Sequence, residues 1–141
     1  MAYNFFIDSD VFLDVLIERE PFFPESFELF KAQYNNLAQL YTTASVILNV
    51  QYIADKLLGK QAAKSAVKEL LSFIKVCVTD KTTITKAYNS SFADVENAVQ
   101  YYSAAEDKSI DFFITRNIKD YKNADEHLKT ITPKEALKIL N

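Results

Sequence analysis

The sequence is poor in the residues on which several common kinds of active site depend. Its only glycine is Gly59, its only cysteine is Cys77 and its only histidine is His127. One glycine cannot build the loops that cradle phosphates in nucleotide-binding proteins. One cysteine and one histidine cannot supply a zinc site of the Cys/His type or an internal disulfide. A Ser-His-Asp or Cys-His mechanism would depend on His127, which lies in the polar stretch 123–127, so we do not expect that chemistry.

Basic charge and long apolar runs are also scarce. The only arginines are Arg19 and Arg116, and the net charge is −3. This balance argues against a protein that coats nucleic acid by bulk electrostatics, although it allows a small basic rim. No apolar run approaches the roughly 20 residues that span a bilayer. Asp8 and Asp10 interrupt the only apolar start that a signal peptide could use. We therefore expect a cytoplasmic protein with no membrane partner.

The sequence does contain the alternation of an α/β protein. Apolar residues make up 49% and charged residues 25% of the 141 residues, which fits one folded domain over residues 1–141. Short β-branched and aromatic runs predict strands at residues 3–7, 40–43, 76–79, 112–115 and 128–131. Amphipathic spacing predicts helices near residues 11–17, 25–36, 46–59, 63–74, 84–89 and 93–105, a short one after 115, and a last one from 133. Such alternation predicts a mostly parallel sheet with helices on both faces.

Acidic and amide side chains gather where the predicted strands end. Ligands in open parallel sheets bind beyond these carboxyl ends. The first strand is followed by Asp8 and Asp10, the third by Asp80, and the fourth by Arg116, Asn117 and Asp120. Asp94, Glu96 and Asn97 open the sixth predicted helix, where Asp94 and Asn97 are three residues apart and share a face. Oxygen ligands of this kind suit Mg²⁺ or Mn²⁺, so the pattern predicts a divalent-metal site.

Each acid also has a structural interpretation. Asp is favoured as a helix N-cap, which would explain Asp8 and Asp94 equally well. Asp14, Glu18 and Glu20 are expected to form a solvated helix side, and Cys77 to be a small buried core residue. Thr132, Pro133 and Glu135 have the spacing of a capping box at a helix start.

Several segments resemble the motifs of PIN domains, in the family's order and over the whole chain. The opening IDSDVFLD of residues 7–14 is similar to the family's first motif, and REPF of residues 19–22 resembles the segment after that motif in one bacterial branch. DVENAVQ of residues 94–100 is similar to the central acidic motif. ITRNIKDY of residues 114–121 and TPKE of residues 132–135 resemble the last motifs.

The resemblance implies a three-layer α/β/α fold and a metal site of four acids. Asp8 matches the first acid, and Asp120 or its neighbour Asn117 matches the last. Asn49 stands where the family usually has glutamate, and Asn97 where it usually has aspartate. These departures remove two formal charges, for which Asp94 and Glu96 could compensate. The metal ligands implied are therefore Asp8, Asp94, Asn97 and Asp120, with Asn49, Glu96 and Asn117 as additional candidates.

The function implied is that of a ribonuclease dependent on Mg²⁺ or Mn²⁺, in which Asp8, Asp94 and Asp120 carry the chemistry. Arg116, Lys119 and Lys56 are the candidate contacts to the phosphates of single-stranded or structured RNA. Many relatives are toxins of toxin–antitoxin pairs, so the resemblance also implies an antitoxin partner and a homodimer.

Two other functions compete with this one. A degenerate PIN domain would bind RNA or a protein without cleavage, for which Asn49 and Asn97 argue. A phospho-receiver domain also places acids at strand ends and could use Asp80 as its acceptor. That fold requires adjacent acids after the first strand, whereas Ser9 separates Asp8 from Asp10.

Overall fold

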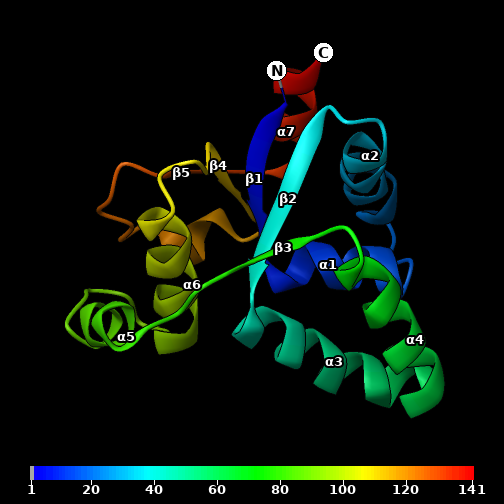
Figure 1. Ribbon diagram of the computed structural model, residues 1–141, viewed down its shortest axis with the longest axis horizontal. Coiled ribbons are helices and arrows are strands. Elements are labelled where there is room, and N and C mark those ends of the chain that lie inside the picture. The colour runs from blue at the N-terminus through cyan, green and yellow to red at the C-terminus, as the bar shows by residue number, and fades with distance from the viewer. Residues whose placement is uncertain (1) are drawn as a thin grey trace.

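The chain folds around one five-stranded parallel sheet (Figure 1). We describe it from a computed structural model that covers residues 2–141. The strands are β1 (Tyr3–Ile7), β2 (Ala38–Thr43), β3 (Lys75–Cys77), β4 (Phe112–Ile114) and β5 (Lys129–Ile131). Their order is β3-β2-β1-β4-β5, and all four neighbouring pairs are parallel. The predicted sheet is therefore confirmed, with β1 at its centre.

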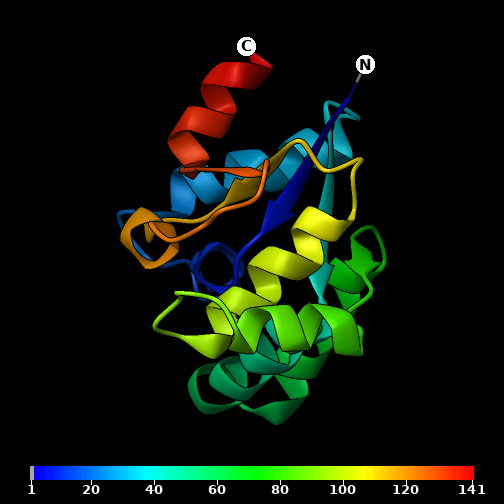
Figure 2. The ribbon, with the colours of Figure 1, turned by 90° about the vertical axis from the view of Figure 1, so that its left-hand side faces the viewer.

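Helices cover both faces of the sheet, which confirms the three-layer α/β/α class. They are α1 (Ser9–Leu16), α2 (Phe23–Tyr34), α3 (Ala44–Leu58), α4 (Lys60–Leu71), α5 (Lys81–Tyr88), α6 (Val95–Glu106), the 3₁₀ turn η1 (Ile118–Tyr121) and α7 (Pro133–Leu140). Figure 1 shows α5 and α6 on one side of the sheet and α1, α2 and α4 on the other. Turned by 90°, Figure 2 shows α6 (yellow-green) in front of the sheet, with its axis in much the same direction as β1 (blue). The predicted elements are all present, with ends shifted by a few residues.

The central strand explains why this topology is stable. Phe5, Phe6 and Ile7 of β1 have no exposed surface, because strands on either side and helices on both faces enclose them. Phe6 stacks on Phe113 of β4 with ring centroids 4.8 Å apart. Such a strand reads as a continuous apolar run rather than an alternating one. Cys77 is buried, as predicted.

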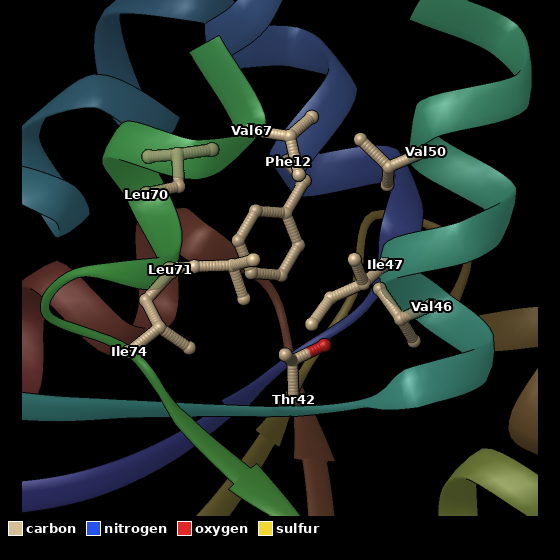
Figure 3. A pocket seen from close by; sticks show the side chains of 9 residues that line it. All are labelled: Phe12, Thr42, Val46, Ile47, Val50, Val67, Leu70, Leu71 and Ile74. Atoms are coloured by element: carbon tan, nitrogen blue, oxygen red, sulfur yellow. The ribbon is translucent and has the colours of Figure 1, made fainter. Parts of the chain in front are cut away.

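A small cavity lies in the core between α1, α3 and α4 (Figure 3). It has a volume of about 10 Å³, and its only polar lining residue is Thr42. The Thr42 hydroxyl is buried without a hydrogen-bond partner. A buried water needs two to four polar partners, so this space is a gap in packing rather than a binding site.

Candidate active site

The site lies at the carboxyl edge of the sheet, where β1 and β4 end side by side. Ile7 pairs with Ile114, and the amide of Asp8 donates to the Ile114 carbonyl at 3.0 Å. The residues after these two strands therefore meet although they are more than 100 positions apart in the chain. The start of α6 and the turn η1 close the same region from one side.

Asp8 is almost fully buried at this edge, with 5% of its surface exposed. Its Oδ1 accepts from the amide of Ser9 at 2.7 Å, as the N-cap of α1. Its Oδ2 accepts from the hydroxyls of Thr115 and Tyr121, each at 2.9 Å. The capping interpretation is thus correct for one oxygen, while the other is held by two hydroxyls from distant segments.

Asp10 stands beside Asp8 and shares a donor with it. The Thr115 hydroxyl lies 3.3 Å from Asp10 Oδ2, which also accepts from the Arg116 amide at 3.1 Å and from Asn117 Nδ2 at 3.0 Å. Asp10 Oδ1 is buried and has no hydrogen-bond partner. Because buried polar atoms are nearly always paired, this oxygen is a vacant acceptor at the site.

Burial leaves the two carboxylates poorly compensated. It raises the pKa of Asp8, although the hydroxyls of Thr115 and Tyr121 oppose the shift. Burial, followed by repulsion from Asp8, raises the pKa of Asp10 to about 7, and the Arg116 charge lowers it only in part. A cation placed between these groups would relieve both desolvation and like-charge repulsion.

The start of α6 contributes an amide and two acids. Asn97 Oδ1 lies 3.3 Å from the Tyr121 hydroxyl, so Asn97 is close to the oxygen that also binds Asp8. Asp94 is exposed, and its Oδ1 accepts from the Asn97 amide at 3.1 Å as the N-cap of α6. Glu96 is exposed too, and its partial burial, then Asp94 and Asp8, raise its pKa. Glu96 therefore adds negative charge within electrostatic range of Asp8, and Asp94 adds charge next to Glu96.

The turn η1 brings Asp120 and Lys119 to the rim of the site. Both residues are exposed. The negative charge of Asp120 is among the causes that raise the pKa of Tyr121, after burial and Asp8. Asp120 therefore lies within electrostatic range of the cluster formed by Asp8, Asp10, Thr115 and Tyr121. Among the described residues, its side chain makes no hydrogen bond to the other acids.

Arg116 is held by the protein rather than free at the surface. Its Nε and Nη2 donate to the two oxygens of Asp14 at 2.6 and 3.1 Å, and its Cζ lies 3.8 Å from the centre of the Phe22 ring. The prediction that Asp14 belongs to a solvated helix side is therefore wrong, because Asp14 is fully buried against Arg116. Glu18 and Glu20 are exposed as predicted.

The two remaining candidates, Lys56 and Asn49, are on α3 and, within residues 2–141, make no hydrogen bond or salt bridge with Asp8 or Asp10. Lys56 is near the end of α3, roughly 20 Å along the helix from Thr43 at 1.5 Å per residue. Its ammonium lies 4.2 Å from the centre of the Tyr52 ring. Asn49 is nearer the start of α3 and half-buried, with no side-chain hydrogen bond in the described part of the chain.

The residues present fit a weakly held divalent cation. Asp8 and Asp10 offer carboxylate oxygens with spare lone pairs, and Asp10 Oδ1 has no partner. In residues 2–141, however, no three His, Cys, Asp or Glu side chains stand close enough together to form a dense metal site. Asn97 supplies an uncharged oxygen nearby, which agrees with weak rather than tight binding.

Sequence reasoning missed three residues of the cluster. It marks Asp10 only as an acid after the first strand, and it assigns no role in the site to Thr115 or Tyr121. Thr115 directly precedes Arg116 and Tyr121 directly follows Asp120, inside the last motif. The polar residues Thr115 and Arg116 at the end of a buried strand, followed by Tyr121 in the same motif, were the pattern from which these contacts could have been predicted.

The strand order excludes the phospho-receiver alternative. That doubly wound fold has the order 2-1-3-4-5, which places its third strand beside the first. Here β3 is at the edge of the sheet, two strands away from β1. Asp80 follows this edge strand and accepts from the Thr83 amide at 3.0 Å, as the N-cap of α5.

Comparison with known proteins points to one family. The model of the PIN domain family matches residues 4–119. No curated protein sequence matches the chain. None of the helices in residues 2–141 has the length and apolar character needed to cross a membrane.

Solved structures with a similar fold include three from bacteria. VapBC2 from Rickettsia felis, bound to a promoter DNA fragment, is 14% identical with a TM-score of 0.66, covering 92% of this chain and 98% of its own. A toxin–antitoxin complex from Klebsiella pneumoniae is 18% identical with a TM-score of 0.62, covering 91% and 96%. VapC20 from Mycobacterium tuberculosis, a sarcin-ricin loop cleaving toxin, is 12% identical with a TM-score of 0.61, covering 77% and 86%. At these identities the similarity is one of fold.

Proposed function

This chain belongs to the PIN domain family, and from that premise we propose that it is a metal-dependent ribonuclease that acts as the toxin of a toxin–antitoxin pair. Family membership and the toxin-like fold of its structural neighbours support a PIN nuclease. The RNA substrate and the metal are the parts that we add. An RNA substrate of this kind places its action in the cytoplasm.

The observation that carries the proposal is the paired carboxylates of Asp8 and Asp10. Asp8 is buried and Asp10 is half-buried beside it, both have raised pKa values, and the buried Asp10 Oδ1 has no partner. A structural role alone would not require a second carboxylate with a buried, vacant oxygen, because Asp8 already caps α1. A cation would complete this arrangement.

Asp8, Asp10 and the oxygen of Asn97 would hold the cation, with Asp120, Asp94, Glu96 and Asn117 at the rim. When bound, Mg²⁺ or Mn²⁺ supplies charge neutralisation for a phosphodiester and a more acidic water for its hydrolysis. The hydroxyls of Thr115 and Tyr121 keep the Asp8 carboxylate in one orientation. The carboxylate is thus already oriented before substrate binds, so no rearrangement is needed at that step.

RNA is the substrate class that the surroundings favour. Lys119 is exposed on η1 next to Asp120 and can contact a phosphate. The Arg116 side chain is 19% exposed, although Asp14 occupies two of its donors. The neighbour described as cleaving the sarcin-ricin loop acts on RNA, which supports the same class here.

Cleavage of labelled RNA with Mn²⁺ tests the proposal. Wild type should cut an unstructured or a hairpin RNA, EDTA should stop the reaction, and Asp8→Asn should abolish it. Asp80→Asn is a matched control, because Asp80 caps α5 as Asp8 caps α1 and asparagine is an equally good cap. Equal activity in wild type and Asp8→Asn would show that the site does not cut RNA.

A second function is favoured by the missing acids. Asn49 and Asn97 are neutral where the family usually has carboxylates, and no dense acidic cluster exists in residues 2–141. A degenerate domain that binds RNA or a protein without cleavage would accommodate these changes. Tight RNA binding by wild type without product at any Mn²⁺ concentration would favour this alternative.

The partner proposals have separate tests. If the chain is a toxin, its induced expression should arrest growth, while Asp8→Asn should not. A homodimer is supported by exposed apolar pairs one turn apart, Leu48 with Tyr52 on α3 and Ile84 with Tyr88 on α5. Sedimentation should show a dimer for wild type and a monomer for Tyr52→Glu. A monomeric wild type would exclude the dimer.

A further inference from the structure

A hollow of about 450 Å³ adjoins the site and takes no part in the metal chemistry. It opens between the start of α2, the segment after β4 and the start of α7, where α2 and α7 pack side by side (Figures 1 and 2). The residues that matter in its lining are Phe22, Glu25, Ser26, Arg116, Pro133 and Lys134. This volume is within the usual range for a small-molecule or cofactor pocket.

Two polar groups in the lining lack partners. Ser26 is 1% exposed, and its hydroxyl has no hydrogen-bond partner. Glu25 is half-buried, and its carboxylate makes no hydrogen bond or salt bridge to the described residues. The Ser26 oxygen is enclosed by the protein, whereas the Glu25 carboxylate lines the hollow with both oxygens free to accept hydrogen bonds from a ligand.

Arg116 and Phe22 supply planar groups to the lining. Arg116 is fixed in its plane by two hydrogen bonds to Asp14 and by contact with the Phe22 ring. The ring of Pro133 adds an apolar surface. Aromatic rings and guanidinium planes are the surfaces on which proteins stack unpaired RNA bases.

The charge of the lining is close to zero. Asp14 neutralises Arg116, and Glu25 offsets Lys134. A bare phosphate would meet the Glu25 carboxylate without a surplus of positive charge. A neutral, planar ligand with hydrogen-bond donors fits better, and the exposed Lys134 can contact a phosphate attached to it.

We propose that this hollow binds a guanine base of the RNA substrate, next to the phosphate that is cut. Guanine is the only RNA base whose Watson–Crick edge presents two adjacent donors, N1–H and the N2 amino group, which match the two oxygens of a carboxylate. Glu25 accepts these donors, and the planar groups of Arg116 and Phe22 stack the base.

The position follows from Arg116, which belongs to both sites. Its amide donates to Asp10 Oδ2 at 3.1 Å, while its side chain lines the hollow. A base in the hollow is therefore separated from the carboxylates by one residue of the protein. This inference rests on the proposed ribonuclease function for the identity of the ligand as RNA.

Binding without cleavage tests it. In EDTA, fluorescence anisotropy should show that wild type binds a labelled AAGAAA hexamer about tenfold more tightly than AAAAAA, a ratio within the range of one bidentate contact. Glu25→Gln should bind both within about twofold. Glu28→Gln, on the exposed side of the same helix, should keep the preference, because Glu28 pairs with Lys31 and does not line the hollow.

Three results would overturn the inference: no RNA binding by wild type, equal binding of the two hexamers, or a preference that survives Glu25→Gln. Tighter binding of both hexamers by Glu25→Gln would identify a phosphate surface instead. The two proposals fail separately. Cleavage with Mn²⁺ but no guanine preference would support the nuclease proposal and contradict the guanine site. A guanine preference without cleavage would support the guanine site and contradict the nuclease proposal.

Discussion

The guanidinium of Arg116 donates two hydrogen bonds to the carboxylate of Asp14, 102 residues earlier in the chain, and Asp14 is completely buried. The same arginine holds Asp10 through its backbone amide. The pair therefore ties α1 to the segment after β4 and fixes the residues that frame the candidate site. Its disruption should affect stability and site geometry together.

Removal of the carboxylate should be strongly destabilising. Asp14→Asn leaves a partly buried guanidinium without its charge partner, which typically costs about 3 to 5 kcal/mol. We expect the lower part of this range, since the Arg116 side chain is 19% exposed. Urea unfolding measures the change. Glu18→Gln, an exposed position on the same segment, should shift the free energy of unfolding by less than about 0.5 kcal/mol. Equal effects of the two variants would contradict a structural role for the pair.

Metal affinity should depend on the carboxylates at the strand ends. We expect one weak Mn²⁺ site that Asp8→Asn abolishes and Asp120→Asn weakens, because Asp8 is in the cluster and Asp120 is at its rim. Calorimetry with Mn²⁺ distinguishes the two effects, and Asp80→Asn should bind as wild type does. If Asp8→Asn and wild type bind equally, the cation is held elsewhere.

The stability of the metal-free protein should fall as the pH rises toward neutrality. The pKa of Asp10 is about 7 in the folded chain, against an ordinary value near 4. A raised acid pKa means that the folded state binds the proton more tightly than the unfolded state. The stabilisation that this proton gives to the folded state is therefore complete below pH ~4 and is lost as the pH rises through ~7. Each unit of pKa difference corresponds to about 1.4 kcal/mol. We therefore expect the free energy of unfolding to fall by about 2 to 4 kcal/mol across this pH range.

Chemical unfolding in EDTA between pH 5.5 and 8 measures this slope. Asp10→Asn should have a flatter profile and be more stable than wild type at pH 8. Asp8→Asn should be as stable as wild type or more so at pH 8, since it removes a repelled charge while asparagine still caps α1. A clear loss of stability in Asp8→Asn would mean that its capping and hydroxyl contacts outweigh the repulsion.

Acids restored at the two asparagines should strengthen the site. Asn97 lies within 3.3 Å of the hydroxyl that binds Asp8, so Asn97→Asp adds a charge close to the proposed cation. Desolvation and carboxylate repulsion offset much of the attraction, and about a tenfold gain in Mn²⁺ affinity, near 1.4 kcal/mol, is expected. Asn49→Glu combined with Asn97→Asp should gain more than either change alone, because ligands of one ion are coupled. Flat affinity in all three variants would show that these side chains do not face the cation.

Local patterns in the sequence determined the elements and one edge of the site. The run of residues 3–7 predicted a buried strand, and the acids that follow it were therefore expected at the carboxyl edge of a parallel sheet. The Thr132, Pro133 and Glu135 pattern specified a helix start, and the structure confirms its capping box. The strand and the helix start depend on residues that are close in the sequence, so the spacing of residue types is enough to predict them.

Only the tertiary structure decided which polar groups meet across the chain. Asp14 looked like part of a solvated helix side, yet it is buried because Arg116 compensates its charge. Tyr121 looked like the end of a motif, yet its hydroxyl binds Asp8 from 113 positions away. A single sequence carries no record of such pairs, because the free energy that buries a charged or polar group comes from a partner brought close by folding.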